Sequence, residues 1–281
     1  MIEYIKILII SLVCGVALPL PVSSGAHLSF INGILDFSDD KNVLGLYYSV
    51  MSVAFSLVIF VFLRKIYLSG IKSLFRKDKK LSGYRKLMKN ILISLIPSLI
   101  LFVPVSEDKL LCDIFDGFLV RSNILLVAVA SVIGSLVLVI SIWYTRQGYS
   151  LTKRSADTKT VIRTAVYQIV SYVIPGISRV SSASTNMLIC DVESKVIIRE
   201  IYLYIAPQML LINTVKIIRF ILADVIVSPL MIAVSVVSVV VMSAVVVTAM
   251  SRINIRRIFA FFAVYGGVIG AAFCVISFVL K

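Results

Sequence analysis

The chain has 281 residues, of which 60% are hydrophobic, and a mean hydropathy of +1.05. Soluble domains are about 45–50% apolar, so this composition excludes a soluble protein and indicates an integral membrane protein. The formal net charge of +14 is also compatible with nucleic-acid binding. However, the charges lie between apolar stretches and no nucleic-acid motif accompanies them. We therefore expect basic loops beside anionic lipid and no nucleic-acid partner.

The N-terminal region and the cysteines indicate neither processing nor cross-linking. The apolar run Ile5–Leu20 lacks a clear basic region before it, and no A-x-A site follows it, so we expect no cleaved signal. The four cysteines are scattered and contain no C-x-x-C pattern. We therefore expect neither a zinc site nor a disulfide framework.

Six segments are long and apolar enough, or nearly so, to cross the hydrocarbon core, which takes about 20 helical residues. Ile91–Val105 is the shortest of them and contains two prolines. Two further apolar segments, about Ile5–Phe37 and Val161–Cys190, are interrupted at mid-length by polar residues. We expect each of these two to form a pair of half-helices that enters the membrane and returns. The six predicted spans are Leu44–Leu63, Ile91–Val105, Ile124–Tyr144, Ile201–Leu222, Val225–Met250 and Ile258–Leu280.

The two polar breaks are the most informative feature of the chain. The first, Leu20–His27, reads L-P-V-S-S-G-A-H, and the second, Pro175–Thr185, reads P-G-I-S-R-V-S-S-A-S-T. An arginine at bilayer depth costs at least about 2.5–3.5 kcal/mol on insertion scales, so Arg179 marks a candidate functional site. Proline and glycine in both breaks leave backbone groups unpaired, which is tolerated only where the segment lines a cavity or packs against protein.

Charged residues orient the predicted spans. The loop Arg64–Lys89 carries ten Lys/Arg against one aspartate, and both Thr145–Arg163 and the segment Arg252–Arg257 are basic as well. By the positive-inside rule these three loops are cytoplasmic and both termini are outside. The loop between the second and third spans then faces outside, and its acidic residues are Glu107, Asp108, Asp113 and Asp116.

This orientation predicts a symmetry. One broken segment followed by three spans occurs twice, over about residues 1–144 and 161–281. The two halves then have opposite orientations, and the breaks meet near the midplane. The repetition of Val22-Ser23-Ser24 as Val180-Ser181-Ser182 agrees weakly with this arrangement. We predict a single all-α membrane domain built as an inverted repeat, with two re-entrant helix pairs and about six transmembrane helices.

The breaks contain groups that suit phosphate chemistry. Arg179 supplies a permanent cation whose planar fork matches phosphate oxygens. A half-helix that begins near Val180 adds an N-terminal anion site. In the first break, a serine hydroxyl and His27 are close enough on one turn to act as nucleophile and general base, or to bind and protonate a leaving phosphate.

The same residues also have structural interpretations. Serine and threonine in membrane helices often only bond to backbone carbonyls, and a lone histidine can be a structural hydrogen-bonding group. Lys216 and Arg219, with Asn213, share one face of Ile201–Leu222 near its outer end. We expect these side chains to snorkel to the interface rather than to form a site.

At this point the residues resemble a known family, the undecaprenyl-diphosphate phosphatases, also called the bacitracin-resistance phosphatases. Gly15–His27, with L-P-V-S-S and a histidine three residues beyond, is similar to that family's first signature. Pro175–Arg179 is similar to its second, P-G-x-S-R-S-G-x-T. Tyr204–Pro207 falls where the family has an apolar run ending in proline, and the layout of spans matches from end to end.

The resemblance implies hydrolysis of undecaprenyl diphosphate to the monophosphate at an outward-facing site. Ser23 and Ser24 match the family's hydroxyl pair, and His27 matches its catalytic histidine. Arg179, beside Ser178, matches its phosphate-binding arginine. The resemblance also implies a divalent cation, Mg²⁺ or Ca²⁺, for which the sequence offers no identifiable ligand set. We therefore predict His27, Ser24 and Arg179 as catalytic residues and Ser23, Gly25, Gly176, Ser178, Ser181 and Ser182 as substrate-binding residues.

The chain departs from the family at an acidic pair. The E-x-x-x-E positions before L-P-V-S-S are Cys14 and Leu18 here, and a leucine can neither ligate a metal nor assist the histidine. The second signature reads V-S-S after the arginine instead of S-G. The family's tyrosine–arginine pair near the C-terminus reads Tyr265-Gly266.

Three functions follow from these observations. The first is a phosphatase of polyprenyl diphosphates, and the second is a non-catalytic relative that binds a lipid phosphate and moves or shields it, as a flippase would. The third is a structural membrane protein with a decayed site. The missing carboxylates favour the binder, whereas His27 favours the enzyme, because a pure binder needs no proton donor. We expect a multi-pass protein of the bacterial plasma membrane with a polyprenyl (di)phosphate partner, and we leave a homodimer open.

Overall fold

A computed structural model describes residues 1–76, 78–106, 109–113, 119–120, 123–146, 155–174, 176–252 and 255–279. Within them the only strands are a short antiparallel hairpin, β1 (Pro104–Ser106) and β2 (Lys109–Leu110). Several predicted loop residues, and Pro175 of the second break, lie outside the described residues. The helices up to residue 146 are α1 (Ile2–Ala17), α2 (Ser24–Leu35), α3 (Lys41–Phe62), α4 (Arg64–Phe75), η1 (Lys79–Leu81), α5 (Ser82–Leu95), η2 (Pro97–Phe102) and α6 (Ile124–Arg146). The later helices are α7 (Thr158–Val173), α8 (Arg179–Ile189), α9 (Ser194–Leu222), α10 (Pro229–Met250) and α11 (Ile255–Val279).

Five of the described helices, α3, α6, α9, α10 and α11, are long and apolar enough to cross a membrane. The remaining predicted span, Ile91–Val105, does not form a single helix, so this prediction was wrong. There α5 ends at Leu95, a 3-10 turn follows from Pro97 to Phe102, and β1 begins at Pro104. Pro97 cannot donate a backbone hydrogen bond, so the hydrogen-bond ladder of α5 does not continue through it.

Both predicted breaks are present, and both separate two helices that pack against each other, α1 with α2 and α7 with α8. The second helix of each pair starts with a serine N-cap. Ser23 Oγ accepts a hydrogen bond of 3.2 Å from the Ala26 N–H, and Ser178 Oγ accepts one of 3.2 Å from the Ser181 N–H. The caps therefore align Ser23 with Ser178, whereas the V-S-S repetition noted in the sequence aligns Ser23 with Ser181, three residues further on.

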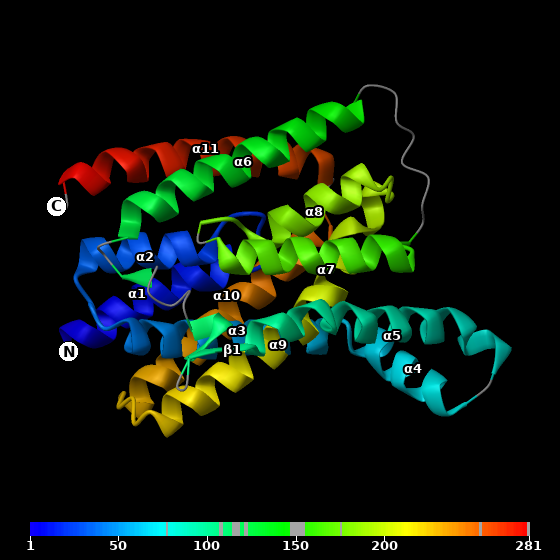
Figure 1. Cartoon of the computed structure of the whole chain (residues 1–281), viewed down its shortest axis with the longest axis horizontal. Helices are drawn as coiled ribbons and strands as arrows, with labels where there is room; N and C mark the ends of the chain where they lie inside the picture. Colours follow the sequence, from blue (N-terminus) through cyan, green and yellow to red (C-terminus); the bar gives the residue numbers. More distant parts are fainter. Residues whose placement is uncertain are drawn as a thin grey trace.

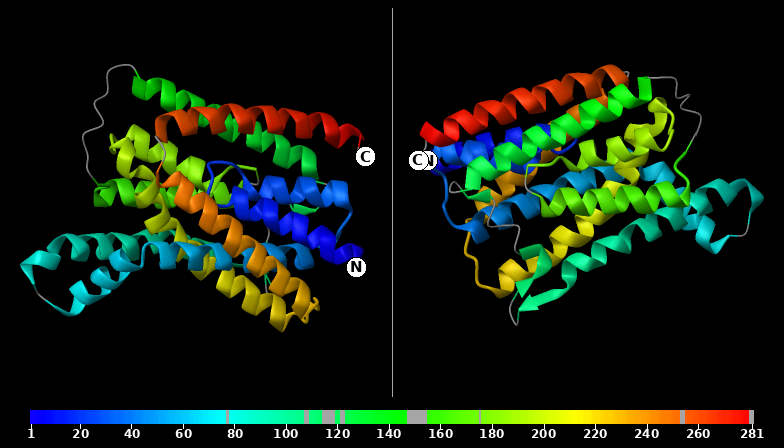
Figure 2. Two further views of the ribbon diagram at one scale, coloured as in Figure 1. Left: turned by 180° about the vertical axis from the view of Figure 1, so that it is seen from behind. Right: turned by 45° about the horizontal axis from the view of Figure 1, so that its top comes forward.

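The two parts of the chain pack with a common pattern. Helix α3 packs against α9 and α6 against α11, while α1 packs against α10 in the way that α5 packs against α7. Figures 1 and 2 show α6 and α11 side by side along one edge of the molecule. In Figure 1 the N- and C-termini lie at one end of the long axis, and α4 with the start of α5 projects at the other.

Helix α9 forms the centre of the core. Tyr202 and Tyr204 are among its fully buried side chains. Tyr202 Oη donates a hydrogen bond of 2.9 Å to the carbonyl of Pro19 and so holds the first break. Pro207 interrupts the α9 hydrogen-bond ladder, and the carbonyl four residues earlier, Leu203 O, instead accepts a hydrogen bond of 3.0 Å from Tyr67 Oη. Tyr67 thus satisfies the carbonyl that Pro207 leaves available, and Tyr202 satisfies the carbonyl of Pro19.

The outer surface of the long helices is apolar. Ile133 and Ile140 on α6, Val237 on α10 and Val264 on α11 are 51%, 61%, 62% and 63% exposed. Extended apolar surfaces of this kind are not left in water, so the long helices present them to lipid.

Candidate functional site

The two breaks meet at a cavity of about 60 Å³, which also reaches α3, α6, α7 and α9. Six of the predicted site residues line it. Gly176 needs to be glycine, because its φ is +95° and a Cβ would collide with the Val127 carbonyl of α6. The predicted residues at the cavity are Ser23, Ser24, Gly25, Gly176, Ser178 and Arg179.

Tyr48 of α3 joins the two breaks at this cavity. Its hydroxyl lies 2.7 Å from Ser24 Oγ and accepts a hydrogen bond of 2.6 Å from Arg179 Nη2. Ser24 and Arg179 are the first residues of α2 and α8, so corresponding positions of the two helix pairs share one phenol. Arginine can only donate, so the Tyr48 hydroxyl accepts from Arg179 and can donate its own hydrogen bond to Ser24 Oγ. The Ser24 hydroxyl is then free to donate a hydrogen bond to a ligand.

The guanidinium of Arg179 is held for anion binding. Its Cζ lies 5.7 Å from the ring centroids of both Tyr48 and Tyr172. Its Nη1 is buried and has no hydrogen-bond partner among the described residues. Since a buried unpaired donor on a charged group is costly, this nitrogen would gain from an anionic partner.

Lys216 of α9 adds a second cation to the same cavity, contrary to the predicted snorkelling. It is 2% exposed, and its Nζ lies 5.7 Å from the ring centroids of both Tyr172 and Phe220. Helix α9 packs against α7 and thereby places Lys216 inside rather than at the interface. Tyr172 therefore lies between two cations, Arg179 and Lys216, that both line the cavity.

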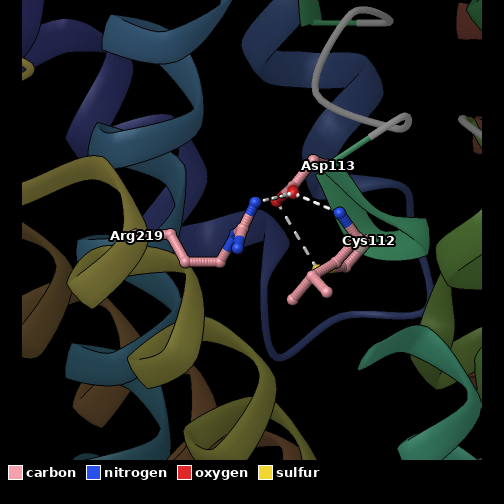
Figure 3. Close-up of polar contacts among 4 residues, drawn as sticks. Cys112, Asp113 and Arg219 are labelled. Atoms are coloured by element: carbon pink, nitrogen blue, oxygen red, sulfur yellow. Dashed lines mark hydrogen bonds and ion pairs between the residues drawn. The ribbon is translucent and has the colours of Figure 1, made fainter. Parts of the chain in front are cut away.

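Arg219, one turn further along α9, serves a different purpose (Figure 3). Its Nη2 lies 2.7 Å from Asp113 Oδ2, and this carboxylate also accepts hydrogen bonds from the Leu110 N–H at 2.8 Å and from Cys112 Sγ at 3.6 Å. The ion pair fixes the segment after β2 to the end of α9. Asn213 is fully buried and donates to the Met209 carbonyl at 2.7 Å, so neither it nor Arg219 snorkels freely.

His27 does not line the cavity. The hydroxyls of Ser23 and Ser24 bond to other groups and not to the His27 ring. Its Nδ1 lies 2.7 Å from the Ser23 carbonyl, and its Nε2 lies 3.1 Å from Tyr265 Oη on α11. A carbonyl only accepts, so in the neutral imidazole Nδ1 donates and Nε2 accepts from Tyr265. The predicted serine–histidine contact is therefore not formed.

Ser181 and Ser182 also lie off the cavity, because their polar groups stabilise α8. The Ser181 N–H donates to the Ser178 cap, and Ser182 Oγ donates a hydrogen bond of 2.8 Å to the Ser178 carbonyl. Ser182 thus occupies in α8 the position that His27 occupies in α2, four residues after the cap.

Sequence reasoning missed three aromatic or cationic residues of the cavity: Tyr48, Tyr172 and Lys216. For Lys216 the signal was available, because a lysine within an apolar span is as costly as the arginine that marked the second break. For the two tyrosines no local pattern distinguishes a cavity residue from an interfacial anchor.

The described residues do not fit the implied divalent cation. Cys14 and Leu18, at the positions of the family's acidic pair, are 0% and 5% exposed and do not line the cavity. Among the residues that the structure describes, no group of three or more His, Cys, Asp or Glu side chains could hold a metal ion. Among the described lining residues the charged groups are two cations, Arg179 and Lys216, which repel a metal and attract an anion.

Apolar long helices around a cationic cavity at two helix breaks define a multi-pass membrane protein with a candidate phosphate site. Comparison with protein families gives a match over residues 7–272 to the family described as Bacitracin resistance protein BacA. The chain belongs to this family, whose members are undecaprenyl-diphosphatases, and the predicted resemblance and all-helical membrane class are confirmed. A search of curated proteins gave no match.

Proposed function

We propose that the chain hydrolyses undecaprenyl diphosphate to undecaprenyl phosphate, which recycles the carrier lipid of cell-wall synthesis. Membership of the family supports the substrate. The observation that carries the proposal is the pair of cations, Arg179 and Lys216, on either side of Tyr172 at the cavity. Phosphoryl transfer depends chiefly on positioning and on charge stabilisation, and two fixed cations in a low-dielectric cavity supply both.

In the proposed reaction, a water oxygen bonds to the terminal phosphorus while the bond from that phosphorus to the bridging oxygen breaks. The products are inorganic phosphate and the lipid monophosphate. Arg179 and Lys216 neutralise the phosphate oxygens, and Ser24 donates to one of them. The backbone amides at the start of α2 and α8 add further donors. The attacking water must also lose a proton, and we assign that proton to His27, one turn along α2 from Ser24, whose Nε2 has to exchange its bond with Tyr265 for one with the water.

A second function, binding and transport of the lipid phosphate without hydrolysis, is favoured by the environment of His27. Both ring nitrogens have protein partners, Ser23 and Tyr265, so the imidazole is not presented to the cavity. The buried Cys14 and Leu18 offer no carboxylate in its place. A binder needs only the cations and the amides.

We further propose that the protein lies in the bacterial plasma membrane as an inverted repeat with both termini outside. The helix pairs α1–α2 and α7–α8 then enter from opposite faces and meet at Tyr48. The common packing pattern of the two parts and the basic character of the α4–α5 end support this orientation.

The decisive experiment measures phosphate release from undecaprenyl diphosphate by the purified full-length protein, with and without Mg²⁺ or Ca²⁺, alongside binding of the same lipid. Turnover establishes the phosphatase. Saturable binding without phosphate release under any of these conditions would contradict it and establish the binder. Loss of phosphate release and of lipid binding in Arg179→Ala would assign the activity to this cavity.

A further inference from the structure

A second cavity, of about 330 Å³, is lined in part by residues of α4 and α5. In Figure 1 α4 and the start of α5 project at one end of the molecule. This cavity shares no lining residue with the Arg179 cavity. Its walls come from α4, η1, α5, the residues just before α7 and the first turns of α9. The site described above therefore leaves it unexplained.

The rim of this cavity is cationic. Lys80, Lys86 and Arg199 line it and are exposed. Within the described part of the chain, neither the Lys80 nor the Lys86 ammonium has an ion-pair partner. Such a cluster attracts an anion.

The one carboxylate in the described lining is already engaged. Glu200 is 2% exposed, accepts a hydrogen bond of 2.9 Å from Tyr204 Oη and lies 3.6 Å from Arg199 Nη2. The Glu200 carboxylate therefore has protein partners. The cavity remains net positive, and a cation is not its natural ligand.

The floor is polar and fixed in place. Asn90 is 3% exposed, its Oδ1 accepts a hydrogen bond of 3.0 Å from Thr158 Oγ1, and its Nδ2 donates at 3.5 Å to the Ala156 carbonyl. These bonds join α5 to the start of α7. A floor that is already ordered loses little entropy when a ligand binds.

The helix beside the cavity indicates where the anion comes from. On α4, Leu68 and Phe75 are 64% and 84% exposed, and Ile71 and Leu74 are also exposed. Exposed basic side chains alternate with them, namely Arg64, Lys65 and Lys72. Exposed apolar and basic side chains together are typical of a helix that lies at a membrane surface.

We propose that this cavity binds the phosphate headgroup of an anionic phospholipid from the surrounding leaflet. Lys80, Lys86 and Arg199 surround the phosphate, while the exposed apolar residues of α4 lie against the acyl chains. This site is independent of the reaction proposed above, so either can fail without the other.

The test uses the full-length protein in detergent micelles and three soluble probes: dihexanoyl phosphatidylglycerol, dihexanoyl phosphatidylcholine and glycerol 1-phosphate. Binding is measured by calorimetry. Phosphatidylglycerol is expected to bind at least about tenfold more tightly than the other two, because it alone combines an unbalanced phosphate charge with acyl chains. The double variant Lys80→Gln/Lys86→Gln is expected to weaken this binding by about tenfold or more.

The matched control is Lys65→Gln/Lys72→Gln, which removes the same charge from exposed positions of α4 that do not line the cavity. It is expected to change binding by less than about threefold. An equal loss in both double variants would overturn the proposal in favour of a diffuse basic surface. Equal binding of phosphatidylcholine would overturn the role of headgroup charge, and equal binding of glycerol 1-phosphate would overturn the lipid assignment in favour of a soluble phosphate ligand. Unchanged melting temperatures of the unliganded variants show that both fold.

Discussion

His27 and Tyr265 are stacked and hydrogen-bonded although 238 residues separate them, with Nε2 3.1 Å from Oη and their ring centroids 6.0 Å apart. This contact ties the first break to α11 and fixes the tautomer of the imidazole. Both proposed functions use the same cavity, so the behaviour of this pair distinguishes between them.

If the chain is a phosphatase, His27→Gln is expected to lower kcat by about a hundred- to ten-thousand-fold, the usual loss for a general acid–base, with lipid binding nearly unchanged. Tyr265→Phe keeps the ring stacking and removes only the hydroxyl, so a smaller loss with an altered pH–rate profile is expected. Phosphate release and lipid binding are measured side by side. Full turnover in His27→Gln would show that another group handles the proton.

Arg179 is expected to be the principal phosphate ligand under either function. Arg179→Lys keeps the charge but loses the planar fork and the hydrogen bond to Tyr48. Arg179→Ala loses the charge as well. We expect weaker lipid-phosphate binding in the order wild type, lysine, alanine, with a total loss of about ten- to a hundredfold. Unchanged binding in both variants would contradict the site.

Lys216 is expected to contribute its charge to binding. Lys216→Met retains the length and the contacts with Tyr172 and Phe220 but removes the cation. Binding of undecaprenyl diphosphate should weaken by about tenfold or more, and binding of the monophosphate less, because the diphosphate carries more charge. Lys195→Met, at the exposed start of α9, is the matched control and should have no effect. Equal effects on the two lipids would exclude a charge-specific role.

Gly176→Ala is expected to destabilise the protein by about 1–3 kcal/mol or to distort the second break, since its φ of +95° and the nearby Val127 carbonyl leave no room for a Cβ. Gly83→Ala is the control. A Cβ at Gly83 meets nothing within 4 Å, and alanine favours the helix by about 1 kcal/mol. Thermal unfolding in detergent measures both, and equal melting temperatures would contradict the strained turn.

Cysteine labelling in intact cells tests the proposed orientation. In a chain whose native cysteines are replaced, Lys79→Cys is expected to be protected from a membrane-impermeant reagent and Ser106→Cys to react with it. Both positions are exposed on the protein, so protection reports the side of the membrane. The reverse pattern would invert the topology.

The helix breaks were predictable because proline, glycine and serine caps act locally. The serine caps place the starts of α2 and α8 after Ser23 and Ser178, and this brings Ser24 and Arg179 to the cavity. The direction in which His27 points was not predictable, because the spacing along α2 does not say which face of the helix meets α11. The same holds for Lys216, whose burial depends on the packing of α9 against α7, and for α5, whose end at Leu95 reflects Pro97 rather than the run of apolar residues.

Neither part of the chain contains the cavity by itself, because Ser24 and Tyr48 come from one and Arg179 and Lys216 from the other. A lipid phosphate held there bridges both parts and binds the assembled protein but not the unfolded chain. By mass action, a ligand at a hundred times its dissociation constant adds about 2.7 kcal/mol to stability. Under either proposed function the lipid phosphate therefore also stabilises the assembled protein, and detergents that strip it during purification are expected to lower the melting temperature.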